Sequence, residues 1–172
     1  MIVDNIKDVQ VIATGSSAFE LADKITVEKY IDLLQKTFVI FTLPAFSKNV
    51  RTEIRKSRKV YFYDNGIRNA LIGNFNPPHS RTDAGALWEN FVISERLKYL
   101  SNRNLNKNTY FWRTTQQQEV DFIEEDANTL NAYEFKWAKN KKIKLSKAFS
   151  RAYPNSSFNV INSKNYEGFL LI

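Results

Sequence analysis

Strand-like alternation of apolar and polar residues is clearest in two short segments of the second half of the chain. Residues 119–124 read EVDFIE and residues 130–137 read LNAYEFKW, and both have the composition of half-buried strands. The polar residues 126–129 between them suit a tight turn. We therefore predict a β-hairpin over residues 119–137.

The register of this hairpin decides which side chains meet. A turn centred on residues 127–128 would place Asp121 opposite Glu134 and Glu119 opposite Lys136. A slip of one residue would destroy both pairings. In the predicted register, acids and a lysine share one face, and the other face of the second strand is aromatic. The alternative interpretation is an ordinary hairpin whose charged side chains are exposed to solvent.

The remaining pattern alternates between helix and strand, which predicts an α/β fold. Thr26 is a candidate N-cap for a helix to residue 36, and Asp83 for a long helix to about residue 100. We expect the first helix to bury an apolar stripe of Val27, Tyr30, Ile31, Leu33 and Leu34. Other predicted strands cover residues 9–13, 38–41, 59–63, 110–113, 158–161 and 168–172, and other predicted helices cover residues 67–72 and 141–151.

Composition narrows the class of protein. The chain has 172 residues, of which 43% are hydrophobic, and this is enough for one globular domain with a small appendage. It has no cysteine, which excludes disulfides and thiolate zinc sites. No apolar run approaches the length of a membrane span, and the first residues do not resemble a signal peptide. We expect a cytoplasmic protein with no membrane partner.

The charge distribution points to a polyanionic partner. The formal net charge is +7, and residues 136–166 contain eight basic residues and no acid. A basic flank beside a group of carboxylates suits a nucleic acid held by its phosphates, whereas a merely solvated basic face is the alternative. The candidate phosphate-binding residues are Lys139, Lys141, Lys142, Lys144, Lys147 and Arg151.

Four motifs appear in a consistent order: KVYFYDNGIRNAL, GALWENFVISERL, YFWRTTQQQEVDFIEE and AYEFKW. Together they resemble the C-terminal domain of a family of predicted prokaryotic AAA+-type ATPases. That domain is of unknown function, and its core is similar to PD-(D/E)xK, restriction-endonuclease-like nucleases. The resemblance implies an α/β, restriction-endonuclease-like mixed sheet flanked by helices over residues 57–172.

The preceding residues resemble other parts of the same ATPases. Residues 1–25 contain a strand and a TGSS turn similar to the ATPase sensor strand, and residues 26–56 resemble part of a winged helix. The P-loop pattern appears nowhere in the chain. We therefore expect a truncated or internally deleted member that carries a small winged-helix/ATPase remnant, binds no ATP and is not an ATPase.

The resemblance also implies a set of site residues. Asp121, Glu134 and Glu89 would hold Mg²⁺ or Mn²⁺, whose hard character suits carboxylate oxygens. Lys136 would be the catalytic lysine, which positions the attacking water or stabilises the phosphorane. Gln118 would orient the substrate.

The expected function is that of a metal-dependent nuclease-like domain acting on DNA phosphodiesters, as a magnesium-dependent endodeoxyribonuclease does. The alternative is a non-catalytic DNA- or protein-binding C-terminal module of an AAA+-type ATPase. A third interpretation is a structural remnant of a larger ATPase. The sequence leaves open whether the chain forms a homodimer.

Overall fold

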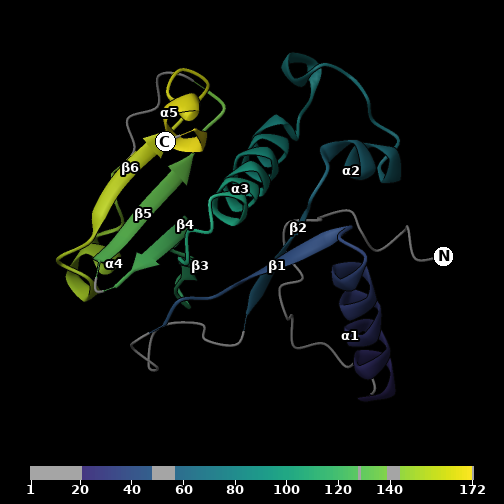
Figure 1. Ribbon diagram of the computed structural model, residues 1–172, viewed down its shortest axis with the longest axis horizontal. Helices are drawn as coiled ribbons and strands as arrows, with labels where there is room; N and C mark the ends of the chain where they lie inside the picture. Colours follow the sequence, from purple (N-terminus) through teal and green to yellow (C-terminus); the bar gives the residue numbers. More distant parts are fainter. Residues whose placement is uncertain (1–20, 48–56, 128, 139–143, 172) are drawn as a thin grey trace.

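The computed structural model of the protein describes residues 21–47, 57–127, 129–138 and 144–171 (Figure 1). Helices and strands are interspersed along this part of the chain, which confirms a mixed α/β fold. The elements are α1 (Leu21–Lys36), β1 (Ile40–Pro44), β2 (Arg58–Phe62), α2 (Asn65–Leu71), η2 (Pro78–Ser80), α3 (Ala84–Asn102), β3 (Asn108–Arg113), β4 (Glu119–Asp126), β5 (Thr129–Phe135), α4 (Lys147–Ala152), β6 (Ser157–Ile161) and α5 (Tyr166–Leu170).

The main sheet has four strands in the order β3-β4-β5-β6 and is mixed. The first three strands are antiparallel, and β6 runs parallel to β5. The β4–β5 hairpin pairs Phe122 with Tyr133 and Asp126 with Thr129 at the two ends of its ladder. This is the predicted register, and it follows from the short turn that joins the two strands.

A second, two-stranded sheet is formed by β1 and β2, which are antiparallel. One bridge between Ala45 and Phe111 connects the end of β1 to β3, and the Phe46 N–H donates to the Phe111 carbonyl at 2.7 Å. The pair therefore joins residues from the predicted segment 26–56 to residues from the predicted domain 57–172. That division of the chain remains a prediction.

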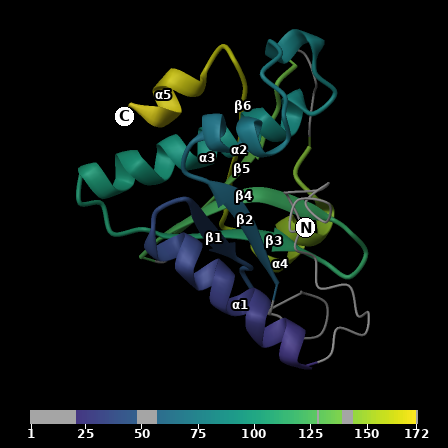
Figure 2. The same cartoon turned by 90° about the vertical axis from the view of Figure 1, so that its right-hand side faces the viewer.

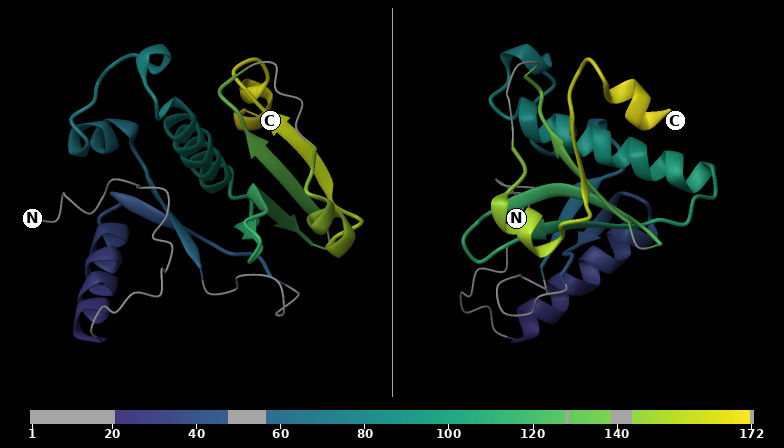
Figure 3. Two further views of the ribbon diagram at one scale, coloured as in Figure 1. Left: turned by 180° about the vertical axis from the view of Figure 1, so that it is seen from behind. Right: turned by 90° about the vertical axis from the view of Figure 1, so that its left-hand side faces the viewer.

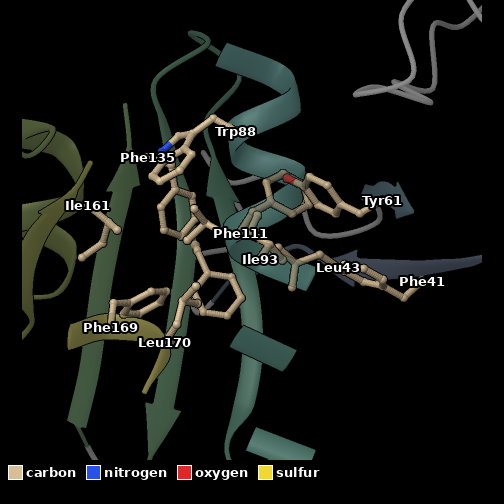
Figure 4. Packing of buried hydrophobic residues seen from close by; sticks show 12 residues of the cluster. Phe41, Leu43, Tyr61, Trp88, Ile93, Phe111, Phe135, Ile161, Phe169 and Leu170 are labelled. Carbon is tan, nitrogen blue, oxygen red and sulfur yellow. The ribbon is translucent and has the colours of Figure 1, made fainter. Parts of the chain in front are cut away.

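The main hydrophobic core lies between α3 and strands of both sheets (Figure 4). Trp88, Val92 and Ile93 of α3 pack with Phe122 and Phe135 and with side chains from β1, β2, β3, β6 and α5. A second cluster packs under α4 and is made of Phe46, Trp112, Val120, Ile123, Leu130, Ala132, Phe149 and Tyr153. Both faces of the sheet are therefore covered by helices, in agreement with the predicted mixed sheet flanked by helices.

Helix α1 differs from its prediction in start and in burial. It already includes Leu21, the first described residue of the chain, so Thr26 lies inside the helix and is not its N-cap. In its predicted apolar stripe only Ile31 is buried, whereas Val27, Tyr30, Leu33 and Leu34 are exposed. The reason is that α1 packs beside the β1–β2 pair, away from α3, as Figures 2 and 3 show.

Three further predictions near helix and strand ends are corrected. The strand predicted at residues 38–41 is β1 at Ile40–Pro44, because Phe38 has a φ of +56° and forms the turn after α1. The strand predicted at residues 168–172 is the helix α5, which buries the consecutive residues Phe169 and Leu170 together. A strand would direct these two side chains to opposite faces. The basic helix predicted at residues 141–151 is the shorter α4, which Ser146 caps.

Two other predictions concern local features. Asp83 occupies the N-cap position of α3, but its side chain caps no backbone N–H and instead binds the guanidinium groups of Arg68 and Arg81. The strand predicted at residues 9–13 lies outside the described residues. No helix in the described segments has the length and apolar character needed to cross a membrane.

Candidate functional site

Six charged side chains meet where β2, α3 and the hairpin approach one another. We call this group the acid–lysine cluster, and it consists of Lys59, Glu89, Glu119, Asp121, Glu134 and Lys136. Four of the six residues were singled out from the sequence as catalytic. The structure therefore brings Glu89, Asp121, Glu134 and Lys136 into one neighbourhood.

Lys136 joins the two acids of the hairpin. Its Nζ lies 2.8 Å from Glu134 Oε1 and 3.5 Å from Asp121 Oδ2. These two oxygens can therefore be no farther apart than the sum of those two distances. The Phe135 N–H donates to Asp121 Oδ2 at 2.9 Å, which fixes the orientation of that carboxylate.

A β-bulge places Asp121 in this position. Tyr110 pairs with Ile123 and Trp112 pairs with Val120, so both Asp121 and Phe122 lie opposite the single residue Phe111. Bulges interrupt the alternation of side chains and redirect them, often beside functional sites. Here the bulge coincides with the end of the β4–β5 ladder, and the Asp121 carboxylate takes the backbone donor of β5.

Two side chains of β2 bind the carboxylate of Glu89. The Tyr61 hydroxyl donates to Glu89 Oε1 at 2.6 Å, and Lys59 Nζ lies 3.1 Å from the same oxygen. Lys59 also pairs with Glu119, which is in turn paired with Arg113. Lys59 and Tyr61 are two residues apart on one strand, and such a spacing directs both side chains to the same face.

Asn90 explains why Glu89 is placed so firmly. Its side-chain amide accepts from the Phe62 N–H at 2.8 Å and donates to the Phe62 carbonyl at 2.9 Å. This buried pair of hydrogen bonds attaches α3 directly to the backbone of β2. The neighbouring Glu89 is thereby set over Lys59 and Tyr61.

The electrostatics of the cluster favour a neutral Asp121. Burial raises the pKa of Asp121 to about 7, and the charges of Glu89 and Glu134 add to the effect, whereas Lys59 and Lys136 oppose it. Burial would likewise raise the pKa of Glu119, but Lys59 and Arg113 outweigh it and hold that pKa below its usual value. Asp121 is therefore a buried carboxylate whose negative charge is incompletely compensated.

The cations and the tyrosine respond to the same field. Burial would lower the pKa of Lys59, yet Glu89, Glu119 and Asp121 outweigh it and hold that pKa above its usual value. The pKa of Lys136 is also raised, because Asp121 and Glu134 outweigh its burial. Burial and the charge of Glu89 raise the pKa of Tyr61, so its hydroxyl stays protonated and donates.

The donor set suits a hard divalent cation. Mg²⁺ is commonly held by one or two carboxylates, several waters and substrate phosphate oxygens. Asp121 and Glu134 offer two neighbouring carboxylates, and the negative charge of Asp121 is incompletely compensated. As the side chains stand, no set of three His, Cys, Asp or Glu residues in the described segments forms a metal site. The ligand roles of Asp121, Glu134 and Glu89 remain predictions.

A hollow of about 330 Å³ opens beside Glu119 and Glu134. It includes three of the residues predicted to bind substrate, namely Gln118, Lys144 and Lys147. Ser146 caps α4 and donates from its hydroxyl to Gln118 Oε1, so it ties this helix to the start of β4. The hollow is lined by Gln118, Glu119, Val120, Glu134, Lys144, Leu145, Ser146, Lys147 and Phe158.

The other predicted substrate-binding residues lie elsewhere. Arg151 is exposed at the end of α4 and does not line the hollow. Lys139, Lys141 and Lys142 lie outside the described residues. Their contribution to phosphate binding remains a prediction.

Sequence reasoning did not assign roles to Lys59, Tyr61 and Glu119. Lys59 is 5% exposed although it is a lysine within the apolar strand RKVYF. A lysine in a strand that is otherwise buried must find carboxylates, because an unpaired buried charge is very costly. That pattern was the available signal for a second cation in the site.

Comparisons with known proteins divide the chain into two matched segments. Residues 5–78 match a family described as a domain of unknown function (DUF8612). Residues 84–168 match a second family, also described as a domain of unknown function (DUF4143). Lys59 and its neighbour Tyr61 lie in the first segment, and the other five residues of the acid–lysine cluster lie in the second.

Two curated relatives are similar over part of the chain. They are uncharacterized proteins of Mycobacterium bovis and Mycobacterium tuberculosis, each 30% identical over 118 residues. The matched stretch covers 64% of this chain and 25% of each relative, so the chain spans about a quarter of their length. No solved structure matches the chain significantly. Over residues 84–168, which hold Glu89, Asp121, Glu134 and Lys136, the chain is similar to the domain of unknown function DUF4143.

Proposed function

We propose that this protein is a metal-dependent nuclease-like domain with a restriction-endonuclease-like core, acting on DNA phosphodiesters. One observation carries the proposal. Two acids of neighbouring strands share the ammonium group of Lys136 in a partly buried cluster where negative charge is incompletely compensated. This is the constellation expected of a D…ExK site, and it stands beside a hollow that contains two further lysines.

Asp121 and Glu134 would hold a Mg²⁺ or Mn²⁺ ion, with Glu89 as a third carboxylate nearby. When bound, such an ion would polarise the phosphodiester and make a water molecule more acidic. The protein supplies orientation: the Phe135 N–H holds the Asp121 carboxylate, and Tyr61 and Lys59 hold Glu89.

Lys136 contributes a fixed positive charge. Its raised pKa keeps the ammonium group protonated at neutral pH, beside both hairpin acids. A cation held in place before the reaction stabilises negative charge that develops on the phosphorus oxygens, and no reorganisation is needed. Lys144 and Lys147 are placed to hold adjacent phosphates at the hollow, which predicts an affinity that falls with salt.

A non-catalytic binding module is the second candidate, and one surface favours it. Helix α1 and the turn after it expose Tyr30, Leu33, Leu34 and Phe38, with Phe38 73% exposed. Exposed apolar side chains clustered on one element are typical of protein interfaces. In this interpretation the charged cluster supports the fold, and the domain holds DNA or a protein without cutting.

The decisive experiment measures cleavage and affinity on the same variants. Supercoiled plasmid is incubated with the whole chain and Mg²⁺ or Mn²⁺, with EDTA as the metal-free control. Asp121→Asn removes a metal ligand and Lys136→Met removes the positive charge, so each should lower the cleavage rate by about 100-fold or more.

The matched controls are Asp126→Asn at the exposed end of β4 and Lys98→Met on the surface of α3. Both should cut like the wild type, because each removes the same type of charge away from the cluster. The binding module would be established instead if the wild-type protein binds DNA but does not cut it with any divalent ion, and if the Asp121→Asn variant binds DNA more tightly than the wild type. Removing a carboxylate near bound phosphates relieves like-charge repulsion.

A further inference from the structure

An aromatic cluster adjoins the acid–lysine cluster. The rings of Trp88 and Trp137 meet edge to face, with centroids 5.5 Å apart, and Trp88 meets Tyr166 in the same way at 5.4 Å. Phe91 completes the group, 5.8 Å from Trp88 and 6.2 Å from Tyr166. Four aromatic side chains from α3, the end of β5 and the start of α5 thus form one continuous patch.

The inner and outer members of this patch differ in exposure. Trp88 is 7% exposed and lies against Phe135 of the main core (Figure 4). Trp137 is 39% exposed although its ring packs on Trp88. The structure therefore exposes part of the Trp137 ring to solvent and supports that ring on the buried Trp88.

The indole N–H of Trp88 has no hydrogen-bond acceptor within the described segments. Buried polar groups are nearly always paired, so this donor is an exception among the described residues.

The patch is directly connected to the charged site. Trp88 immediately precedes Glu89, and Trp137 immediately follows Lys136. Consecutive Cα atoms are about 3.8 Å apart, so the backbone positions of the two tryptophans adjoin those of Glu89 and Lys136. A nucleotide bound with its phosphate at the acid–lysine cluster would carry its base into the reach of these rings.

We propose that Trp137, supported by Trp88, is a stacking platform for an unpaired nucleobase next to the phosphate bound at the acid–lysine cluster. The substrate class is then single-stranded nucleic acid, or a duplex with unpaired bases at the site. Aromatic side chains stack on every base, but only bases that have left the helical stack present their faces. This inference rests on the proposed function, because it requires a nucleic acid at the cluster.

The test compares strands with equal charge and different bases. Affinities of the whole chain are measured in EDTA for an oligothymidine of about 16 nucleotides, a length within known site sizes, and for an abasic strand of the same length. The variants are Trp137→Ala, Trp137→Phe and, as a matched control, Phe75→Ala at another highly exposed aromatic residue. Thermal unfolding of every variant accompanies the titrations.

Wild-type protein should prefer the oligothymidine to the abasic strand by about fivefold or more, since base stacking contributes about 1–3 kcal/mol and 1.4 kcal/mol is tenfold. Trp137→Ala should remove that preference and leave the abasic affinity unchanged. Trp137→Phe should retain part of it, and Phe75→Ala all of it. Retention in Trp137→Phe also excludes loss of folding as the cause.

The outcomes separate this inference from the proposed function. Equal affinity of the wild type for both strands, or an undiminished preference in Trp137→Ala, would overturn the stacking platform while nucleic-acid binding stands. Stronger binding of fully paired duplex than of oligothymidine would also overturn it. Absence of binding to any of these nucleic acids would reject the proposed function and this inference together.

Discussion

Strand β4 carries two buried acids that lie three residues apart and have very different surroundings. Glu124 is fully buried and receives two contacts from the guanidinium group of Arg96, at 2.6 and 3.1 Å, and one from Lys107 at 3.0 Å. Asp121 is also buried, but its cation, Lys136, is 3.5 Å away and is shared with Glu134. Glu124 therefore has two cations in contact, whereas Asp121 shares its cation with a second acid.

The two environments have different physical consequences. Glu124 is paired with both Arg96 and Lys107, and Arg96 also donates to the Phe169 carbonyl, so this group ties α3, β4 and α5 together. Around Asp121 the acids Glu89, Glu119 and Glu134 compete for Lys59, Lys136 and Arg113. The first arrangement is complete without a ligand, whereas a cation would stabilise the second. Perturbed, partly compensated acids of this kind are typical of functional sites.

The largest loss of stability should come from breaking the buried ion pair between Arg96 and Glu124. Arg96→Ala leaves Glu124 buried with Lys107 as its remaining cation, and loss of one partner of a buried ion pair costs about 3–5 kcal/mol. We expect the free energy of unfolding, measured by urea titration, to fall by that amount. A loss below about 1 kcal/mol would show that Glu124 relaxes into solvent or is satisfied by Lys107.

A substitution at Asp121 is expected to raise the free energy of unfolding instead of lowering it. The folded pKa of about 7 lies above the value near 3.9 of an unfolded aspartate, so protonation favours the folded state. This stabilisation is complete below about pH 4 and is lost as the pH rises to about 7. Asp121→Asn, which keeps an acceptor for the Phe135 N–H, should therefore stabilise the protein at pH 8 by about 1–3 kcal/mol.

The pH dependence provides the control for that variant. At pH 4, where both the wild-type carboxyl and the asparagine are neutral, the stabilities should differ little. Thermal unfolding at pH 4, 6 and 8 measures the difference. A variant that is less stable than the wild type at pH 8 would mean that Lys59 and Lys136 compensate Asp121 fully, as Arg96 and Lys107 do for Glu124.

The smallest change in stability is expected at a solvent-exposed ion pair on α3, the helix that also carries Arg96. Glu95 and Lys98 of α3 are in contact at 2.6 Å, with side chains 38% and 41% exposed. Exposed pairs contribute about 0–1 kcal/mol, because water and salt screen them. Glu95→Gln should change the free energy of unfolding by less than about 0.5 kcal/mol, and a larger loss would show that α3 is unusually sensitive to any charge change.

Much of the hairpin is determined by the sequence itself. The short polar turn and the composition of EVDFIE and LNAYEFKW were sufficient to predict both strands and their register. The long helix α3 was also predicted within a few residues, because its hydrophobic residues recur with helical spacing. Local signals suffice here since turn length and side-chain period act between neighbours in the chain.

Elements whose environment depends on distant partners were predicted less well. The apolar stripe of α1 reads like a core helix, but only Ile31 finds partners on β1 and β2. The last apolar residues read like a strand, but Phe169 and Leu170 both enter the core as one helical turn. A hydrophobic pattern shows that a segment can be buried, and tertiary packing decides whether and how it is.

The site shows the same division. The sequence supplied Asp121, Glu134 and Lys136 on adjacent strands and Glu89 on a helix, because short spacing and a family resemblance identify them. Only the tertiary structure decided that a bulge opposite Phe111 redirects Asp121, and that Asn90 attaches α3 to β2 beside Glu89. Lys59 and Tyr61 enter the cluster from a strand that is far away in sequence. Charges act through space, so their balance is fixed only when the fold brings them together.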